Sequence, residues 1–384
     1  MANSHKKRNI PLCRSTVGSN ELSAIKRVLD SQWLAHGSMN EELEEMFAGY
    51  IGVKRAVTVN SCTSGLQLAL EANGIRGEVI CPSFTFVATY NAIVTAGAIP
   101  VFADIDPATC NISAGSIEKM ISSRTEAIIV VHFAGQTCQM DKIVALTRKH
   151  RLLLIEDSAE TIGGTFKGKQ AGSFGVGCFS FFPTKNITTG EGGMVTTNSV
   201  RMADKIKTLA SHGVAKGTMR KKSKGKKYPW QREAVIVGYN YRMCNILAAV
   251  GVEQFKKLDS MNDARRKHAA YLNRYLSRNK NISVPIEADG CHHVYQMYTV
   301  QVEQRRRDAL VLALRERGIE ASVHFDPPVH KQCVSKQKNK KQLYLPVTEK
   351  VSSSIITLPM YPDLKKIDLD YMIDVFCSII NQYS

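Results

Sequence analysis

Short apolar segments alternate with helical segments through the first two-thirds of the chain, and this alternation limits the possible folds more than any other feature. The predicted strands include residues 55–59, 78–81, 99–104, 127–132 and 152–155. Several are apolar on both faces, which is typical of a sheet covered by helices on its two sides. Because strands that alternate with crossover helices form parallel sheets, the sequence predicts an α/β fold.

The pattern changes after about residue 175. We expect two strands joined by a Gly-rich turn, at 175–182 and 193–197, and then a long helix at 246–276. The remaining segments predict strands at 293–302 and 321–325 and helices at 308–317 and 369–380. We therefore predict a large α/β domain over residues 1–260 and a small C-terminal α+β domain over residues 261–384.

Basic residues exceed acidic residues, 51 to 34, which gives a formal net charge of +17. Such an excess favours anionic ligands. Part of it lies in a predicted surface loop at 213–229, where residues 216–227 hold seven Lys and Arg. No aromatic residues interleave with these charges, and no helix-turn-helix, zinc-finger or RNP motif is present. Nucleic-acid binding or regulation through residues 216–227 is therefore the weaker alternative to an enzyme.

The ten cysteines are dispersed and include no CxxC pair, as in proteins that keep their thiols reduced. The histidines form no metal-binding motif, so we expect no metal site. No run of eighteen apolar residues and no secretory signal are present. These observations predict a cytoplasmic protein with no membrane partner.

Polar and aromatic residues follow the predicted strands where ligands bind in open α/β sheets. Residues 60–65 (Asn-Ser-Cys-Thr-Ser-Gly) open a helix, either as a phosphate seat or only as its cap. Residues 82–87 include Phe84 and Phe86, which suit either a core or a ligand stack. Asp157 ends an apolar strand, where a carboxylate costs free energy unless it is paired.

Lys185 is the only charged residue between Lys169 and Glu191. A lysine in such surroundings can act as a nucleophilic amine. Together, an amine, an acid, an aromatic ring and a phosphate seat are what pyridoxal 5'-phosphate (PLP) chemistry requires.

The order of these motifs resembles the DegT/DnrJ/EryC1/StrS family of nucleotide-sugar aminotransferases. The resemblance covers nearly the whole chain and is carried by residues 31–37, 60–65, 82–89, 131–136, 155–160, 180–185, 189–194, 238–243 and 358–362. It implies an aspartate aminotransferase-like PLP fold of type I, with a large, mixed, mostly parallel sheet domain and a small C-terminal α+β domain. It also implies a homodimer with shared active sites.

The resemblance assigns a role to individual residues. Lys185 matches the Schiff-base lysine and proton shuttle, and Asp157 matches the acid that pairs with the pyridinium nitrogen. The other cofactor-binding matches are Phe86 (ring stacking), Thr63, Ser64 and Ser180 (phosphate), Glu160 (the PLP 3′-hydroxyl) and Asn240 (the phosphate of the partner subunit). Cys62 is a departure, because a glycine is usual at its position.

A glutamate at position 160 resembles the GDP-perosamine synthase group within that family, which aminates GDP-4-keto-6-deoxymannose. The resemblance therefore implies transfer of an amino group, with L-glutamate as the expected donor, to a nucleotide-linked 4-keto-6-deoxy sugar in polysaccharide or O-antigen biosynthesis. A dTDP- or UDP-linked 3- or 4-ketosugar stays open as the alternative substrate.

Overall fold

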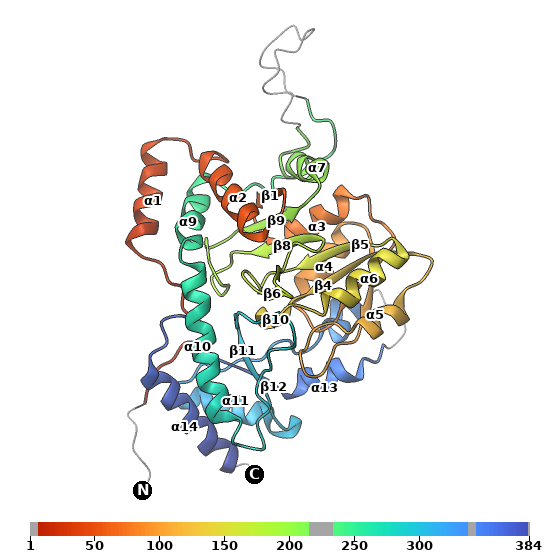
Figure 1. The fold of residues 1–384 in the computed structure, drawn as a ribbon. Coiled ribbons are helices and arrows are strands. Elements are labelled where there is room, and N and C mark those ends of the chain that lie inside the picture. The colour runs from red at the N-terminus through yellow and green to blue at the C-terminus, as the bar shows by residue number, and fades with distance from the viewer. Residues whose placement is uncertain (1–6, 215–232, 337–342, 383–384) are drawn as a thin grey trace, which may run out of the picture.

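The computed structural model describes residues 7–214, 233–336 and 343–382, and a seven-stranded sheet forms its centre (Figure 1). The strand order is β1-β9-β8-β5-β4-β2-β3. The bounds are β1 Arg55–Val59, β2 Glu78–Pro82, β3 Ile99–Ala103, β4 Thr125–Val131, β5 Leu153–Asp157, β8 Val176–Ser180 and β9 Gly193–Thr197. Strands β3, β2, β4, β5 and β8 are parallel, and β9 runs antiparallel to both of its neighbours. The predicted large, mixed, mostly parallel sheet is confirmed.

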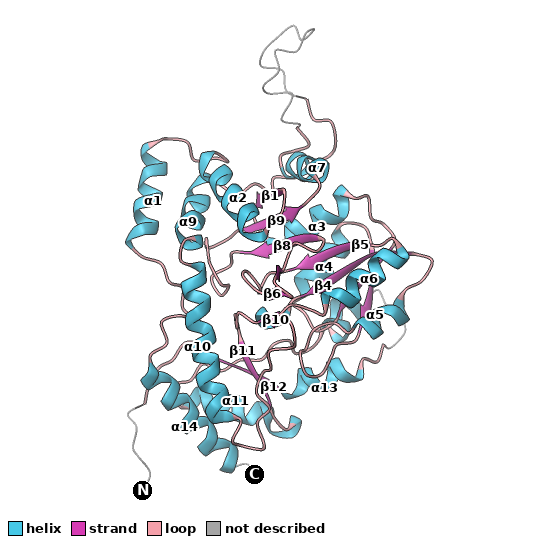
Figure 2. Cartoon of the chain, in the orientation of Figure 1, coloured by secondary structure: helices cyan, strands magenta, loops and turns pink. Residues whose placement is uncertain are grey.

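Helices cover both faces of this sheet, as the double-sided apolar strands predict (Figure 2). Along β2, Val79 and Cys81 pack into one apolar cluster, whereas Ile80 packs into another. The first cluster includes residues of α3 (Cys62–Ala72), α4 (Val87–Thr95) and α7 (Val200–Ala210), and the second includes residues of α5 (Ala114–Met120) and α6 (Met140–His150). Successive side chains of β2 therefore pack against helices on opposite faces of the sheet.

Helices α1 (Ser19–Asp30) and α2 (Ser38–Ile51) pack against α9 (Asn245–Phe255), which is followed by α10 (Leu258–Leu276). The prediction of one helix over 246–276 was wrong, because the chain breaks the helix between α9 and α10, at Lys256 and Lys257. The periodicity continues across the break, since Leu258 is buried, so apolar spacing alone does not reveal it.

A third apolar cluster centres on a two-stranded antiparallel sheet of β11 (Tyr298–Gln301) and β12 (Ile355–Leu358). Residues of α10, α11 (Arg307–Glu316) and α14 (Lys366–Gln382) also belong to this cluster. The predicted strand at 293–302 is realised only over β11. The predicted strand at 321–325 was wrong: only Ser322 makes a bridge there, to Thr357. The segment instead turns toward the large sheet.

Short elements complete the described chain. They are β6 (Thr165–Phe166), β7 (Lys169–Gln170), β10 (Cys291–His292), η1 (Phe133–Gly135), η2 (Gln304–Arg306), η3 (Val329–Lys331), α12 (Cys333–Lys336) and α13 (Pro346–Ser354). Most of the predicted basic loop at 213–229 lies outside the described residues. The division into 1–260 and 261–384 stays a prediction, and its junction falls in the first turn of α10.

No helix among residues 7–214, 233–336 and 343–382 combines the length and the apolar character that crossing a membrane requires.

Candidate active site

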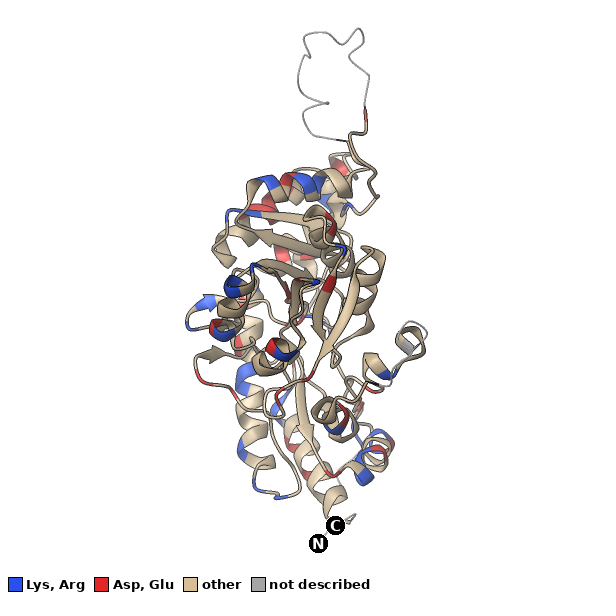
Figure 3. Ribbon diagram, turned by 90° about the vertical axis from the view of Figure 1, so that its right-hand side faces the viewer, with Lys and Arg blue, Asp and Glu red and all other residues tan. Residues whose placement is uncertain are grey.

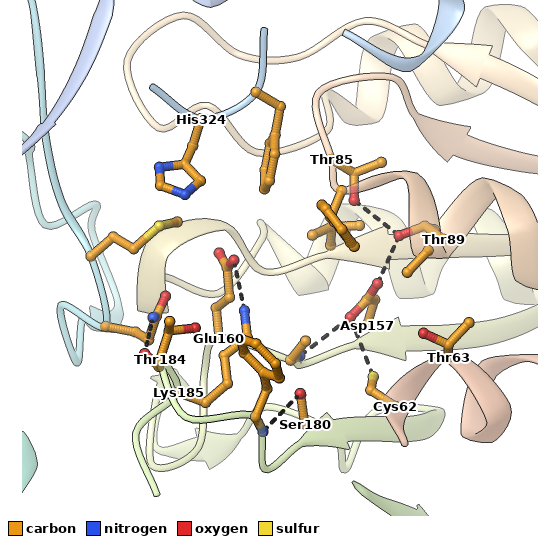
Figure 4. Close-up of a pocket in the computed structure, with 18 of the residues that line it drawn as sticks. Cys62, Thr63, Thr85, Thr89, Asp157, Glu160, Ser180, Thr184, Lys185 and His324 are labelled. Atoms are coloured by element: carbon orange, nitrogen blue, oxygen red, sulfur yellow. Dashed lines mark hydrogen bonds and ion pairs between the residues drawn. The ribbon is translucent and has the colours of Figure 1, made fainter. Parts of the chain in front are cut away.

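A cavity of about 420 Å³ lies at the carboxyl ends of the central strands, with part of its wall formed by β12. This is where open α/β sheets bind their ligands, and the volume suits a small organic molecule. Six of the eight predicted site residues line it, and all but Phe86 are labelled in Figure 4: Thr63, Phe86, Asp157, Glu160, Ser180 and Lys185. Residues separated by more than a hundred positions in sequence therefore meet at one site.

The other two predicted residues, Ser64 and Asn240, do not line the cavity. The Ser64 hydroxyl lies 2.9 Å from the Ser61 hydroxyl, within the first turn of α3. Asn240 is exposed and bridges Ser211 through its backbone. Their predicted contacts with a phosphate stay predictions.

Strand alternation separates two adjacent carboxylates of β5, and only Asp157 faces the cavity. Glu156 points to the other side and is fully buried. Its two oxygens accept backbone N–H bonds from Gly172, Phe174 and Gly175, each at 2.8 Å, and the His132 imidazole lies 3.1 Å away. Glu156 is therefore saturated with donors and serves the fold.

Asp157 is also buried, but its donors are weaker. Its carboxylate accepts from the Thr89 hydroxyl at 2.8 Å, from the Ala159 N–H at 3.3 Å and from the Cys62 thiol at 3.8 Å. Burial is the largest influence on Asp157 and raises its pKa, because a desolvated carboxylate favours the neutral form. A cation held against Asp157 would relieve this cost, so the site is built for a positively charged group.

Lys185 supplies an amine at the same cavity. Its Nζ lies 3.1 Å from Glu160 Oε1, and the other Glu160 oxygen accepts the Ala134 N–H at 2.9 Å. The Lys185 side chain is 16% exposed, so the amine is accessible only through the cavity. Glu160 thus holds the amine in place and is itself fixed by the backbone.

The backbone around Lys185 is held by residues from distant elements. The Thr184 carbonyl accepts from the Gln296 amide at 2.7 Å. On the other side, the Asn186 amide donates to Asn262 of α10 at 2.8 Å. These contacts limit the freedom of the turn that carries the lysine.

The first turn of α3 forms the predicted anion seat. Ser61 is the N-cap and accepts from the Ser64 N–H at 3.1 Å, whereas the N–H of Thr63 has no partner within the helix. Gly193 of β9 packs against this turn, and a Cβ there would lie 2.6 Å from the Cys62 nitrogen. Cys62 is accommodated as the first helical residue, with its thiol buried toward Asp157 rather than in the seat.

Phe86 precedes α4 and is 64% exposed, an unusual state for a large apolar ring beside a cavity. The hydroxyl of its neighbour Thr85 lies 2.9 Å from that of Thr89. Because Thr89 donates to Asp157, Thr85 donates to Thr89, and this series orients the carboxylate. Sequence reasoning missed Thr89, although its spacing of four from Thr85 on a helix start was a signal.

Sequence reasoning also missed two residues that reach the cavity from later segments. Gln296 and His324 both line it. His324 Nδ1 lies 2.7 Å from the Thr357 hydroxyl, and burial lowers the pKa of the imidazole. The segment around His324 resembles a family stretch near the substrate, but the sequence favoured a structural role for this histidine. Gln296 has no local signal, and only the fold brings it to the cavity.

The set has a definite chemical capacity. An accessible amine can condense with a carbonyl, a buried carboxylate can hold a cationic ring, and a helix N-terminus can bind a phosphate. These three groups fit PLP: its aldehyde matches the amine, its ring nitrogen matches the carboxylate and its phosphate matches the helix N-terminus.

Comparison with known proteins gives a consistent result. Residues 15–376 match the DegT/DnrJ/EryC1/StrS aminotransferase family. The spore coat polysaccharide biosynthesis protein SpsC of Bacillus subtilis is 36% identical over 385 residues, which covers 98% of each chain.

Two solved structures share the whole fold. Helicobacter pylori PseC, an aminotransferase involved in the biosynthesis of pseudoaminic acid, has a TM-score of 0.90 and 28% identity, covering 98% of this chain and 100% of its own. The putative sugar aminotransferase Spr1654 of Streptococcus pneumoniae, solved in a PMP form and a PLP form, has a TM-score of 0.90 and 26% identity. The match covers 98% of this chain, and 98% and 99% of the Spr1654 chain in the two forms.

The contrast between the two carboxylates of β5 is testable by stability. In cofactor-free protein, Glu156→Gln removes acceptors from buried donors, so we expect a loss of about 1–3 kcal/mol for each donor left unpaired. Asp157→Asn removes a costly buried charge and leaves the protein at least as stable as wild type at pH 7. Chemical denaturation of both variants measures the difference.

The pH dependence of the same comparison follows from the raised pKa of Asp157. The folded state binds the proton more tightly than the unfolded state, so ionisation of Asp157 destabilises the fold as pH rises above about 4. The advantage of Asp157→Asn is therefore expected at pH 7 and should shrink toward pH 4. A large destabilisation by Asp157→Asn at pH 7 would show that Asp157 serves the fold instead.

Proposed function

This chain belongs to the DegT/DnrJ/EryC1/StrS aminotransferase family and is a PLP-dependent sugar aminotransferase, and from that premise we propose its substrate and the roles of its residues. The substrate is a nucleotide-linked 4-keto-6-deoxy sugar, with GDP-4-keto-6-deoxymannose favoured, and the amino donor is L-glutamate. The observation that carries the proposal is the meeting of the Lys185 amine and the Asp157 carboxylate at one cavity.

In this proposal the described residues hold PLP by its ring nitrogen, its phosphate and one face of its ring. Asp157 binds the ring nitrogen, the first turn of α3 with Thr63 and Ser180 binds the phosphate, and the exposed ring of Phe86 covers one face. The proposal also keeps Ser64 as a phosphate ligand, although its hydroxyl lies 2.9 Å from the Ser61 hydroxyl in the described structure. When bound, PLP supplies an electron sink that makes the proton on a neighbouring carbon acidic.

Three side chains then perform the proton chemistry. The Lys185 amine removes the proton from the donor carbon and returns it at the cofactor carbon, acting as base and then as acid. Asp157 keeps the ring nitrogen protonated throughout, because its own burial makes that cation its best partner. In the proposal Glu160 binds the 3′-hydroxyl of PLP, and its carboxylate, 3.1 Å from Lys185 Nζ, keeps the amine directed into the cavity.

Two observations support the choice of sugar. Glu160 stands at the position where it resembles the GDP-perosamine synthase group, and SpsC and PseC are named for roles in polysaccharide and pseudoaminic acid biosynthesis. The Glu160 match favours the GDP-linked sugar, whereas the names of SpsC and PseC support the amination of a sugar in general.

The regulatory alternative has less support. On the side of the molecule in Figure 3, Lys and Arg positions lie among Asp and Glu positions rather than in one block. The run 216–227, on which that alternative rested, lies outside the described residues.

We include a homodimer with shared active sites in the proposal. Asn240 is exposed and outside its own cavity, as a residue that serves a neighbouring copy would be. Several large apolar side chains are also exposed: Trp33, Phe86, Phe182 and Val237. A second copy of the chain would cover such residues, and a twofold interface would repeat the exchange of Asn240 in both directions.

Lys185→Ala is the direct test of the proposed chemistry. We expect loss of the visible cofactor absorbance and a fall in kcat on the order of 10³-fold or more, because no other described side chain at the cavity combines an amine with this position. Lys142→Ala, an exposed lysine on α6, is the matched control and should retain both. Turnover by Lys185→Ala at the control rate would contradict the proposal.

A panel of ketosugars tests the substrate. The enzyme is supplied with L-glutamate and with GDP-, dTDP- or UDP-linked ketosugars, and formation of 2-oxoglutarate and aminosugar is followed. The proposal predicts the highest kcat/KM for GDP-4-keto-6-deoxymannose. A higher value for a dTDP- or UDP-linked sugar would reassign the substrate without affecting the role of Lys185.

Mixing two inactive variants tests the shared site. Equal amounts of Lys185→Ala and Asn240→Ala, once their subunits have exchanged, should recover about a quarter of wild-type activity, because half the dimers are mixed and each of these has one intact site. Each variant alone is the control. Recovery no greater than the sum of the two controls would argue against exchange of Asn240 between subunits.

A further inference from the structure

Ser83, His330 and Glu349 form a hydrogen-bonded series outside the cavity. Ser83 directly follows β2, His330 lies in η3 and Glu349 lies on α13. The Ser83 Oγ is 2.6 Å from His330 Nδ1, and His330 Nε2 is 3.2 Å from a Glu349 oxygen.

The order of hydroxyl, imidazole and carboxylate is that of an acyl-transfer triad, but Ser83 cannot serve as a nucleophile. It is 0% exposed, and it does not line the cavity. Its Oγ also accepts the backbone N–H of His330 at 3.0 Å. The series is therefore suited to holding a segment in place rather than to reacting with a substrate.

Both ends of the series are fixed to the large sheet. The Ser83 carbonyl accepts the Val329 N–H at 3.0 Å. Asp104, which follows β3, accepts the N–H groups of Val347 and Thr348 at 3.1 and 2.8 Å and so binds the first turn of α13. His330 thus lies between two anchors that belong to neighbouring strands.

The protonation of the ring follows from its partners. A carboxylate only accepts, so Nε2 carries a proton toward Glu349, and the Ser83 hydroxyl donates to Nδ1. The charged groups near His330 are Glu349, Lys331 and Asp104, and Lys331 also pairs with Glu349. Burial is the largest influence and lowers the pKa of His330, which agrees with a neutral ring.

The segment held in this way enters the cavity at its other end. His324 and Phe325 both line the cavity. The Phe325 ring packs against Phe84 and Phe133, with ring centres 5.6 and 6.2 Å apart. Phe84 is the neighbour of Ser83, so the chain that carries Phe86 and the segment that carries His324 are joined at one place.

We propose that Ser83, His330 and Glu349 are positioning residues that fix the 324–330 segment to the end of β2. They thereby hold Phe325 in the cavity wall together with His324, which lies across the cavity from Thr63 and Ser180 (Figure 4). This inference rests on the proposed aminotransferase function. It assigns the three residues to substrate binding rather than to cofactor binding, because the residues that would hold PLP do not belong to the fixed segment.

Variants of His330 and Ser83 separate this role from a general loss of structure. Ser83→Ala and His330→Gln each remove the bond between these residues, whereas His330→Asn keeps a polar group near the Nδ1 position. For Ser83→Ala and His330→Gln we expect KM for the ketosugar to rise about tenfold, with kcat within about threefold of wild type, because uniform binding is lost while the proton transfer at Lys185 is untouched. His330→Asn should restore most of the KM.

The controls and the double variant sharpen the test. His150→Asn, an exposed histidine at the end of α6, should behave as wild type. Ser83→Ala combined with His330→Gln should raise KM no more than Ser83→Ala alone, because Ser83→Ala already removes both hydrogen bonds that the Ser83 hydroxyl makes to His330. An unchanged KM in both single variants overturns the inference, and so does a rise in KM that is matched by an equal loss of PLP affinity.

Hydrogen exchange tests the positioning without turnover. In cofactor-free protein, Ser83→Ala should speed exchange in peptides covering 322–332 and leave the peptide around β5 and Asp157 unchanged. Equal exchange in both proteins overturns the inference. If wild type itself binds no PLP and transfers no amino group, the proposed function fails, and the exchange result still stands or falls by itself.

Discussion

The buried Asp157 carboxylate is the constraint on which the rest of the site depends. It lies at the end of a central strand with three donors, of which only the Thr89 hydroxyl is close at 2.8 Å, and burial raises its pKa. A protein retains such a group only where a partner of opposite charge completes it. The other groups at the cavity add to this one. The Lys185 amine suits an aldehyde, and the first turn of α3 suits a phosphate.

The fold meets this constraint through strand alternation. Glu156 and Asp157 are adjacent, yet one is saturated by three backbone N–H groups while the other faces the cavity. The same sheet delivers Ser180 and, beyond it, Lys185, so the acid and the amine come from neighbouring parallel strands. Distant segments then fix the amine, through Gln296 on one side and Asn262 on the other. Stability and chemistry are thus divided between the two faces of one strand.

The sequence predicted the large sheet, the helix start at 60–65, Phe86 and Asp157 from local signals, namely apolar strands followed by polar or aromatic residues. Lys185 was marked by its uncharged surroundings, whereas Glu160 and Ser180 were predicted only through the family resemblance. Gln296 and His324 were not predicted as site residues, because long-range packing brings them to the cavity. The helix break at Lys256 was hidden by continuous periodicity, and the 321–325 segment is apolar because Phe325 packs on Phe84, not because it forms a strand. Asn240 was predicted only through the family resemblance, and it lies exposed outside the cavity of its own chain.

The most direct measurement is to reduce the PLP-loaded enzyme with borohydride, digest it and locate the modified lysine by mass spectrometry. The account predicts that the cofactor is attached to the peptide containing Lys185 and that Asp157→Asn lowers the fraction attached. Attachment to a different lysine, or none in wild type, would contradict it.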